Sequence, residues 1–141
     1  MSRAATLVAL GASIVALGVS TYLTVEHYDH STTLACPESA TINCLKVTTS
    51  SWSVVAGVPV AVAGLAYFVV MTGLLVAALR TTAVDLALLV GSAVGVVTAL
   101  YLVGVELFAV DAICLWCTSV HVLTLIVFGA VLWRRTTPVR A

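Results

Sequence analysis

Four apolar runs constrain this chain more than any other feature, because each is long enough to cross a bilayer as a helix. About 20 residues, rising 1.5 Å each, span the roughly 30 Å of hydrocarbon. The runs cover residues 4–25, 59–79, 86–105 and 113–133. Since the connections after the second and third runs are short, successive helices must be antiparallel. The sequence predicts an all-α membrane protein, a four-transmembrane-helix bundle, as a single domain over residues 1–141.

The composition agrees with this fold class and excludes others. Hydrophobic residues make up 62% of the chain and charged residues 9%, which is far from the composition of a soluble globule. Six basic and six acidic residues cancel, and no lysine or arginine cluster offers a phosphate-binding face. We therefore expect no binding to nucleic acid. The first run exceeds a signal-peptide core and precedes no clear cleavage site, so we expect a retained helix.

Basic residues predict the orientation of the bundle, because they concentrate in cytoplasmic loops. Those on one side of the predicted topology are Arg3, Arg80, Arg134, Arg135 and Arg140. Only Lys46 lies on the other side, so we expect both termini in the cytoplasm of a multi-pass cell-membrane protein. All four cysteines then face the oxidising compartment. The long first loop would be extracytoplasmic, and its segment 47–56, which includes Trp52, is expected to form a short surface helix.

The cysteines form two pairs that suggest redox chemistry. Cys36 and Cys44 lie in the polar first loop, and Cys114 and Cys117 form a CxxC at the start of the fourth run. With Asp111 as N-cap, Cys114 would lie in the first turn of a helix and Cys117 almost one turn later on the same face. The helix dipole would stabilise a thiolate there, whereas burial in lipid would oppose it. Thiol–disulfide exchange moves two electrons per step, so an aqueous pair above a membrane-level pair predicts an electron relay.

Three other interpretations of the cysteines remain open. Two static disulfides could staple the loop of a non-catalytic membrane scaffold, since oxidising compartments favour such bridges. A four-cysteine zinc site is less favoured, because a C-x₇-C pair is wider than the usual half-site, and we expect no metal. The cysteines could also be apolar packing.

Two further sequence patterns predict how the third helix packs and where the second helix begins. In the third run Ala87, Gly91, Gly95 and Ala99 recur every four residues, which predicts a ridge for close helix contact. Pro59 suits the first position of the second helix, where its missing N–H has no consequence.

Acidic residues suggest where water begins on each side of the membrane. Glu26, Glu106 and Asp111 are expected to mark the outer boundary. Asp85 is expected to mark the inner one.

The order of these features resembles the vitamin K epoxide reductase family, in particular its bacterial members that reoxidise disulfide-forming proteins. Family members have a four-helix core, an outer-loop cysteine pair separated by seven residues, a serine soon afterwards, and a CxxC opening the last helix. Here these are Cys36, Cys44, Ser50 in preference to its neighbour, Cys114 and Cys117. The quinone-linked DsbB type of bundle has the opposite cysteine order.

The resemblance implies a function and an order of transfer. Cys36 would receive electrons from a partner, Cys44 would pass them to the Cys114–Cys117 disulfide, and Cys117 would face a membrane quinone, either menaquinone or ubiquinone. No thioredoxin-like segment follows the fourth run, so the partner is expected to be a separate extracytoplasmic DsbA-like protein with a thioredoxin fold. This is the function of a quinone-dependent thiol oxidoreductase.

The resemblance also suggests residues of a quinone pocket. Ser50 would help to shape it, His121 occupies the position of a tyrosine of the animal enzymes, and Val60 that of a pocket asparagine. His121 could hydrogen-bond a quinone carbonyl or donate a proton, although a packed bundle histidine is an equal alternative. Aromatic candidates, which could instead be interfacial anchors, are Trp116, Tyr67, Phe68 and Tyr101.

Overall fold

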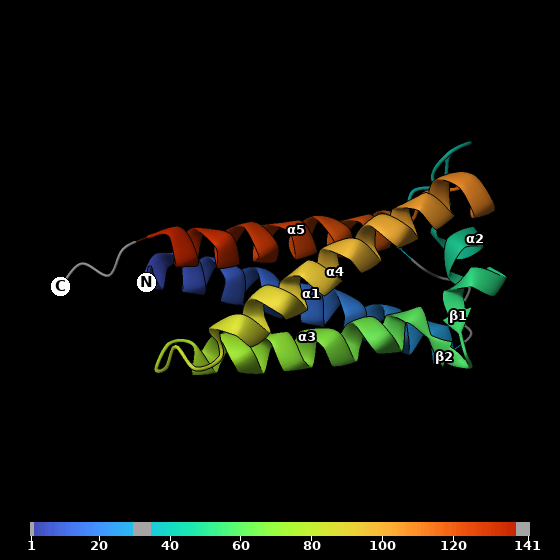
Figure 1. Ribbon diagram of the computed structural model, residues 1–141. Coiled ribbons are helices and arrows are strands. Elements are labelled where there is room, and N and C mark those ends of the chain that lie inside the picture. Colours follow the sequence, from blue (N-terminus) through green and yellow to red (C-terminus); the bar gives the residue numbers. More distant parts are fainter. Residues whose placement is uncertain (1, 30–34, 138–141) are drawn as a thin grey trace.

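The computed structural model describes residues 2–29 and 35–137, and Arg140 lies outside these ranges. Within them, four helices are long and apolar enough to cross a membrane (Figure 1). They are α1 (Arg3–Asp29), α3 (Val60–Ala77), α4 (Asp85–Gly104) with its π-helical continuation η2 (Val105–Val110), and α5 (Leu115–Thr136). The predicted all-α membrane bundle is confirmed, although the first and third spans are longer than expected.

The four long helices are arranged so that α1 begins and α5 ends at the same end of the bundle (Figure 1). We call this the terminal end, and the α3–α4 connection lies there too. The short elements of the first loop and the η2–α5 junction lie at the opposite end, which we call the cysteine end. α1 has its most extensive contacts with α5 and α3, whereas α3 and α4 contact each other little.

Small residues let α1 occupy the middle of the bundle. The buried small residues of α1 are Ala5, Ala9, Ala12, Ser13, Ala16 and Ser20. Their spacing of three and four places them on one helix face, where short side chains allow close approach. The ridge predicted on the third helix holds only in part, because Gly95 and Ala99 are buried whereas Ala87 is exposed. The helix rotates so that Leu88 and Ser92 share its buried face instead.

The terminal half of the bundle is tightly packed. Its core of buried side chains includes Met71, Leu75, Leu88, Val127 and Val131, contributed by α3, α4 and α5. Ala9 and Ala12 of α1 complete this core.

A buried arginine ties the four long helices together at the terminal end. Arg134 of α5 is 3% exposed and forms an ion pair with Asp85 of α4, with Nη2 and Oδ1 2.7 Å apart. Its Nη1 donates to Thr6 Oγ1 of α1 and to the Ala78 carbonyl after α3, both at 2.9 Å. Arg134 therefore differs from the loop arginines with which it was grouped, because its charge is compensated inside the protein.

The first loop contains two short helical pieces instead of the predicted surface helix over residues 47–56, which is wrong in extent. The helix α2 (Cys44–Thr48) begins earlier, because the Asn43 side chain accepts a hydrogen bond from the Lys46 N–H and caps it. A single 3₁₀ turn, η1 (Ser51–Ser53), follows.

A small hairpin then leads into α3. Strands β1 (Val54–Val55) and β2 (Val58–Pro59) pair antiparallel. The intervening Ala56 and Gly57 both have positive φ, 52° and 81°, as a tight two-residue hairpin turn requires. Because Pro59 is engaged in this hairpin, it caps α3 rather than occupying the first helical position as predicted.

Candidate functional site

Cys36 and Cys44, the loop pair, form a disulfide at the cysteine end. Cys36 is half-buried, whereas Cys44 is 1% exposed. The chain just before Cys36 is anchored to the bundle, since Trp116 Nε1 donates to the Ala35 carbonyl at 2.9 Å. The Trp116 ring also packs against Tyr22, with ring centroids 5.0 Å apart. Of the two sulfurs, Cys36 is therefore the one within reach of another protein.

A backbone bridge joins the loop to the segment that precedes the CxxC. Ile42 and Ile113 form a parallel β-bridge. The Asn43 N–H donates to the Ile113 carbonyl at 3.0 Å, and the Ile113 N–H donates to the Thr41 carbonyl at 2.9 Å. Cys114 directly follows Ile113 and Cys44 lies two residues after Ile42, so the bridge holds together the two stretches of backbone that lead to the buried cysteines.

Cys114 and Cys117, the membrane pair, are free thiols at the start of α5. The predicted N-cap is wrong: Asp111 has left-handed φ and ψ of 55° and 41° and ends η2 instead. Cys114 itself caps α5, because its Sγ accepts the Cys117 N–H at 3.2 Å. The Cys117 thiol also donates to the Cys114 sulfur, and this hydrogen bond lowers the pKa of Cys114. Cys114 is thus favoured as the thiolate of the pair.

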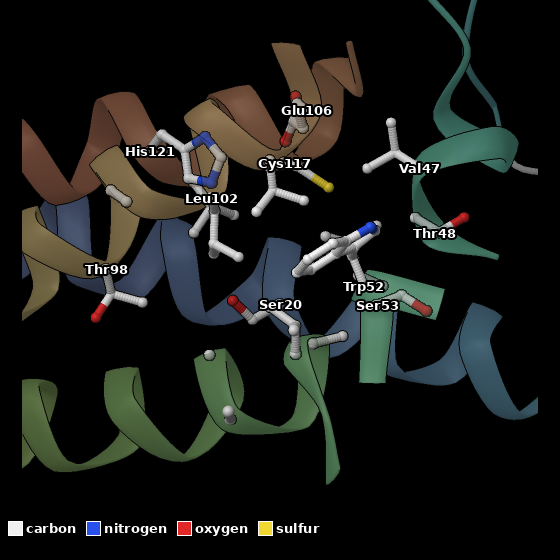
Figure 2. A pocket seen from close by; sticks show the side chains of 18 of the residues that line it. Ser20, Val47, Thr48, Trp52, Ser53, Thr98, Leu102, Glu106, Cys117 and His121 are labelled. Carbon is white, nitrogen blue, oxygen red and sulfur yellow. The ribbon is translucent and has the colours of Figure 1, made fainter. Parts of the chain in front are cut away.

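A cavity of about 330 Å³ lies between the long helices at the cysteine end, with Cys117 in its wall. It is mostly apolar, and α2 and η1 cover it on the side of the loop. Figure 2 shows Glu106, Cys117 and His121 along one wall, with Trp52 facing them across the cavity. Its size is within the range of small-molecule sites, which are largely apolar with a few placed polar groups.

Comparison with protein families covers nearly the whole chain. Residues 7–132 match the vitamin K epoxide reductase family. The chain belongs to that family. A comparison with curated proteins found no match. Family membership makes the protein a multi-pass membrane oxidoreductase, and members of the family use quinones in general.

The structure brings several of the residues that the family suggested for a quinone pocket to one cavity. Ser50, Val60 and His121 line it together with Cys117, whereas Trp116 is not among the described residues of its wall. Of the other aromatic candidates, Tyr67 and Phe68 line it and Tyr101 is exposed. Their role in binding a quinone remains a prediction.

His121 is the buried polar group of the cavity that lacks a partner. It is 7% exposed, and its Nδ1 has no hydrogen-bond partner among the residues that the structure describes. Buried polar atoms are usually paired, because leaving one unpaired costs about 1–3 kcal/mol. The orphaned nitrogen beside an apolar cavity is thus suited to a ligand oxygen.

Glu106 was not recognised from the sequence as part of the site. It was expected to mark the water boundary, but it is 5% exposed and lines the cavity. Its position held a usable signal, since it lies seven residues after Ala99 and eleven after Gly95, in register with the buried face of α4. Trp52, which was expected at the membrane surface, is 47% exposed and also contributes to the cavity wall.

Proposed function

We propose that this protein is a thiol oxidoreductase that reoxidises a thioredoxin-fold, DsbA-like protein outside the cytoplasm and passes the electrons to a membrane quinone. The observation that carries the proposal is the Ile42–Ile113 bridge. It joins the chain before Cys44 to the chain before Cys114, while Cys117 lines an apolar cavity. The electron path therefore leads from the loop pair through the membrane pair to the cavity.

The first transfer takes place at the loop pair. A partner thiolate attacks the half-buried Cys36 sulfur, breaks its bond to Cys44 and forms a mixed disulfide. The partner's second thiolate then releases Cys36, so the partner leaves as a disulfide and the loop pair holds two electrons. Attack at Cys44 is disfavoured because that sulfur is buried.

The second transfer takes place between the pairs. The Cys44 thiolate attacks Cys114 of an oxidised membrane pair and releases Cys117 as a thiolate, and Cys36 then attacks Cys44 to restore the loop disulfide. The products are an oxidised loop pair and a reduced membrane pair, the redox state found in the structure. The lowered pKa of Cys114 supports its role, since a low-pKa thiol leaves faster.

The final transfer takes place in the cavity. When bound there, a quinone supplies an acceptor for two electrons and two protons. The apolar wall, including Val60 and Trp52, would hold the ring and exclude water, and the unpartnered Nδ1 of His121 would bond an oxygen. Ser50 donates its hydroxyl to the Val47 carbonyl at 2.8 Å, which fixes the side chain in the wall. Cys114 and Cys117 close to a disulfide as the electrons leave.

This path requires the loop pair to face the compartment of the partner. Arg3, Arg80 and Arg135 are exposed at the terminal end, whereas Lys46 lies at the cysteine end, and this asymmetry supports an extracytoplasmic cysteine end. After reduction, a membrane-impermeant maleimide added to intact cells should label Cys36, while tags at either terminus stay protected. An externally accessible terminal tag would reverse the orientation.

The decisive experiment combines the purified protein with a reduced thioredoxin-fold protein and a soluble quinone. One quinone should be reduced for each partner disulfide formed. The Cys36→Ser variant should lose partner oxidation but still reduce quinone after its membrane pair is reduced chemically, whereas Cys117→Ser should lose quinone reduction. A scaffold with static disulfides would catalyse neither reaction, and partner oxidation without quinone reduction would exclude the proposed acceptor.

A further inference from the structure

Glu106 is a buried carboxyl that the electron path does not use. It is 5% exposed and supplies the only carboxyl among the described residues that line the cavity. Ionisable side chains within membrane spans are expensive to bury and are usually functional. Glu106 lies in the π-helical segment η2, and such segments often occur at functional sites. Packing alone would be served as well by an apolar side chain.

Two hydrogen bonds connect Glu106 to the segment that carries the membrane pair. Its Oε2 accepts the Cys114 N–H at 3.3 Å, and its backbone carbonyl accepts the Ala112 N–H at 3.1 Å. The carboxyl is therefore held beside the start of α5. Figure 2 shows it on the same wall of the cavity as Cys117 and His121.

Quinone reduction by a dithiol has a proton requirement that the cysteines alone do not meet. A thiolate and a thiol become a disulfide and give up two electrons but one proton, whereas the quinone needs two protons for both of its oxygens to become hydroxyls. The Cys117 thiol keeps its proton while it hydrogen-bonds the Cys114 sulfur. That proton must leave Cys117 before the disulfide can close, in a cavity that is mostly apolar.

We propose that Glu106 is the proton carrier of the cavity, taking the proton of the Cys117 thiol and delivering it to a quinone oxygen. This inference rests on the proposed function. The carboxylate gains the proton as the Cys117 sulfur bonds to Cys114, and it loses the proton as the quinone oxygen becomes a hydroxyl. Glu106 thus ends each cycle as it began. Two electrons pass from the sulfurs to the quinone; one proton comes from Cys117 through Glu106, and the second, which Cys114 lost when it became a thiolate, comes from water.

The other titratable groups of the cavity are less suited to this step. The Tyr67 hydroxyl donates to the Gly91 carbonyl at 3.0 Å, so its proton is already engaged. His121 lies one helical turn beyond Cys117, and His27 is on α1; neither has a hydrogen bond to the membrane pair among those found in the described chain. Glu106 alone of these is bonded to the backbone of Cys114.

The test is a single turnover of the chemically reduced protein with a soluble quinone, followed by quinone absorbance. Glu106→Gln keeps the size of the side chain and an oxygen to accept the Cys114 N–H, but it cannot carry the proton as a carboxylate. We expect it to slow quinone reduction by about 100-fold, as loss of a general acid–base group does. Exchange between the partner and the loop pair should stay within about twofold, which separates the proton step from misfolding.

Three further variants make the result specific. Glu106→Asp should restore part of the rate, and Asp111→Asn, which changes a nearby exposed acid and tolerates its positive φ, should retain it. In Glu106→Ala, added acetate should restore quinone reduction in proportion to its concentration, because a free carboxylate can enter the vacated space. A merely structural glutamate would not be replaced by acetate in this way.

The outcomes separate this inference from the proposed function. If the wild-type protein does not reduce quinone, the proposed function itself is wrong. If the wild type does so and Glu106→Gln reduces quinone at the same rate, only the role of Glu106 is overturned. Equal loss of quinone reduction and of loop-pair exchange in Glu106→Gln, without acetate rescue of Glu106→Ala, would also overturn it.

Discussion

Ile42 and Ile113 connect the two halves of the redox site through a single parallel β-bridge. One residue belongs to the first loop and the other lies directly before Cys114. Because the bridge is made by backbone groups, it fixes the path of the loop whatever the neighbouring side chains are. Main-chain hydrogen bonds therefore hold the backbone before Cys44 beside the backbone before Cys114.

Breaking the bridge should uncouple the pairs. Ile113→Pro removes the N–H that donates to the Thr41 carbonyl at 2.9 Å. We expect electron transfer from the loop pair to the membrane pair to slow by roughly 10- to 100-fold, because small misplacements of reacting groups have large effects on rate. Rapid acid quenching with thiol labelling measures this step. Ile113→Val keeps the N–H and should react normally; equal rates in both variants would contradict the prediction.

The exposure of the loop pair predicts which sulfur the partner meets. In Cys44→Ser the lone Cys36 thiol should attack a partner supplied as its disulfide and accumulate as a mixed disulfide, because Cys44 is absent and cannot displace the partner. Non-reducing electrophoresis and mass spectrometry identify the joined cysteines. A complex joined instead to Cys114 or Cys117, in a protein whose other cysteines are intact, would reverse the proposed order.

The hydrogen bond from the Cys117 thiol predicts how Cys114 titrates. Because this bond lowers the pKa of Cys114, the thiolate persists to lower pH than that of an ordinary cysteine. Cys117→Ala removes the donor, so the pKa of Cys114 should rise and its thiolate should form only at higher pH. Thiolate ultraviolet absorbance against pH measures this while the loop disulfide is kept intact. Cys117→Ser keeps a donor and should cause a smaller rise; an unchanged midpoint in Cys117→Ala would refute the assignment.

A matched pair of glycine substitutions tests the cavity wall. A Cβ added at Gly95 would overlap the Tyr67 hydroxyl and would lie 3.1 Å from Thr124 Cγ2. Gly95→Ala should therefore displace Tyr67 into the cavity, raise the KM for quinone and destabilise the fold by about 1–3 kcal/mol. Gly73→Ala meets no atom within 4 Å and should be neutral or stabilising by up to about 1 kcal/mol. Quinone kinetics give the KM and thermal unfolding in detergent gives the stability of each variant. If the two variants behave alike, Gly95 and Tyr67 do not shape the quinone cavity.

The buried ion pair predicts a stability change without a change in chemistry. Arg134 and Asp85 have side chains 4% and 13% exposed. Asp85→Asn leaves the arginine charge buried without its counter-charge, which should destabilise the protein by about 3–5 kcal/mol. Thermal unfolding in detergent measures the loss, and quinone KM should stay unchanged because the pair lies outside the cavity wall. An unaltered unfolding midpoint would mean that the pair contributes nothing to stability.

Hydrophobic length made the four spans predictable, because it is a local property of the sequence. The end of the third span was misjudged at Glu106, since a charged residue suggested water there. In the structure the helix continues through η2 to Val110 and Glu106 points inward, supported by the N–H of Cys114. That support comes from a residue eight positions away across a turn, which no local pattern contains.

Other details of the site depended on contacts that the sequence does not display. Asp111 has a good N-cap side chain, but the bridge at Ile113 draws the chain into an extended path and moves the cap to Cys114. Arg134 looked like a loop arginine because its partners, on three other helices, are far away in sequence. The Cys36–Cys44 pair, by contrast, could be predicted, because the two cysteines lie close together in the sequence and apart from the CxxC.

The tightly packed terminal half and the hollow cysteine half contribute differently to the stability of the fold. The core around Met71 and Leu75 and the Arg134–Asp85 pair hold the helices together, whereas the other half encloses a cavity of about 330 Å³. A wall substitution that meets open space, unlike Gly95→Ala, should therefore remove little of what keeps the protein folded. The hollow end can therefore accept changes in side-chain size or polarity that the tightly packed end could not.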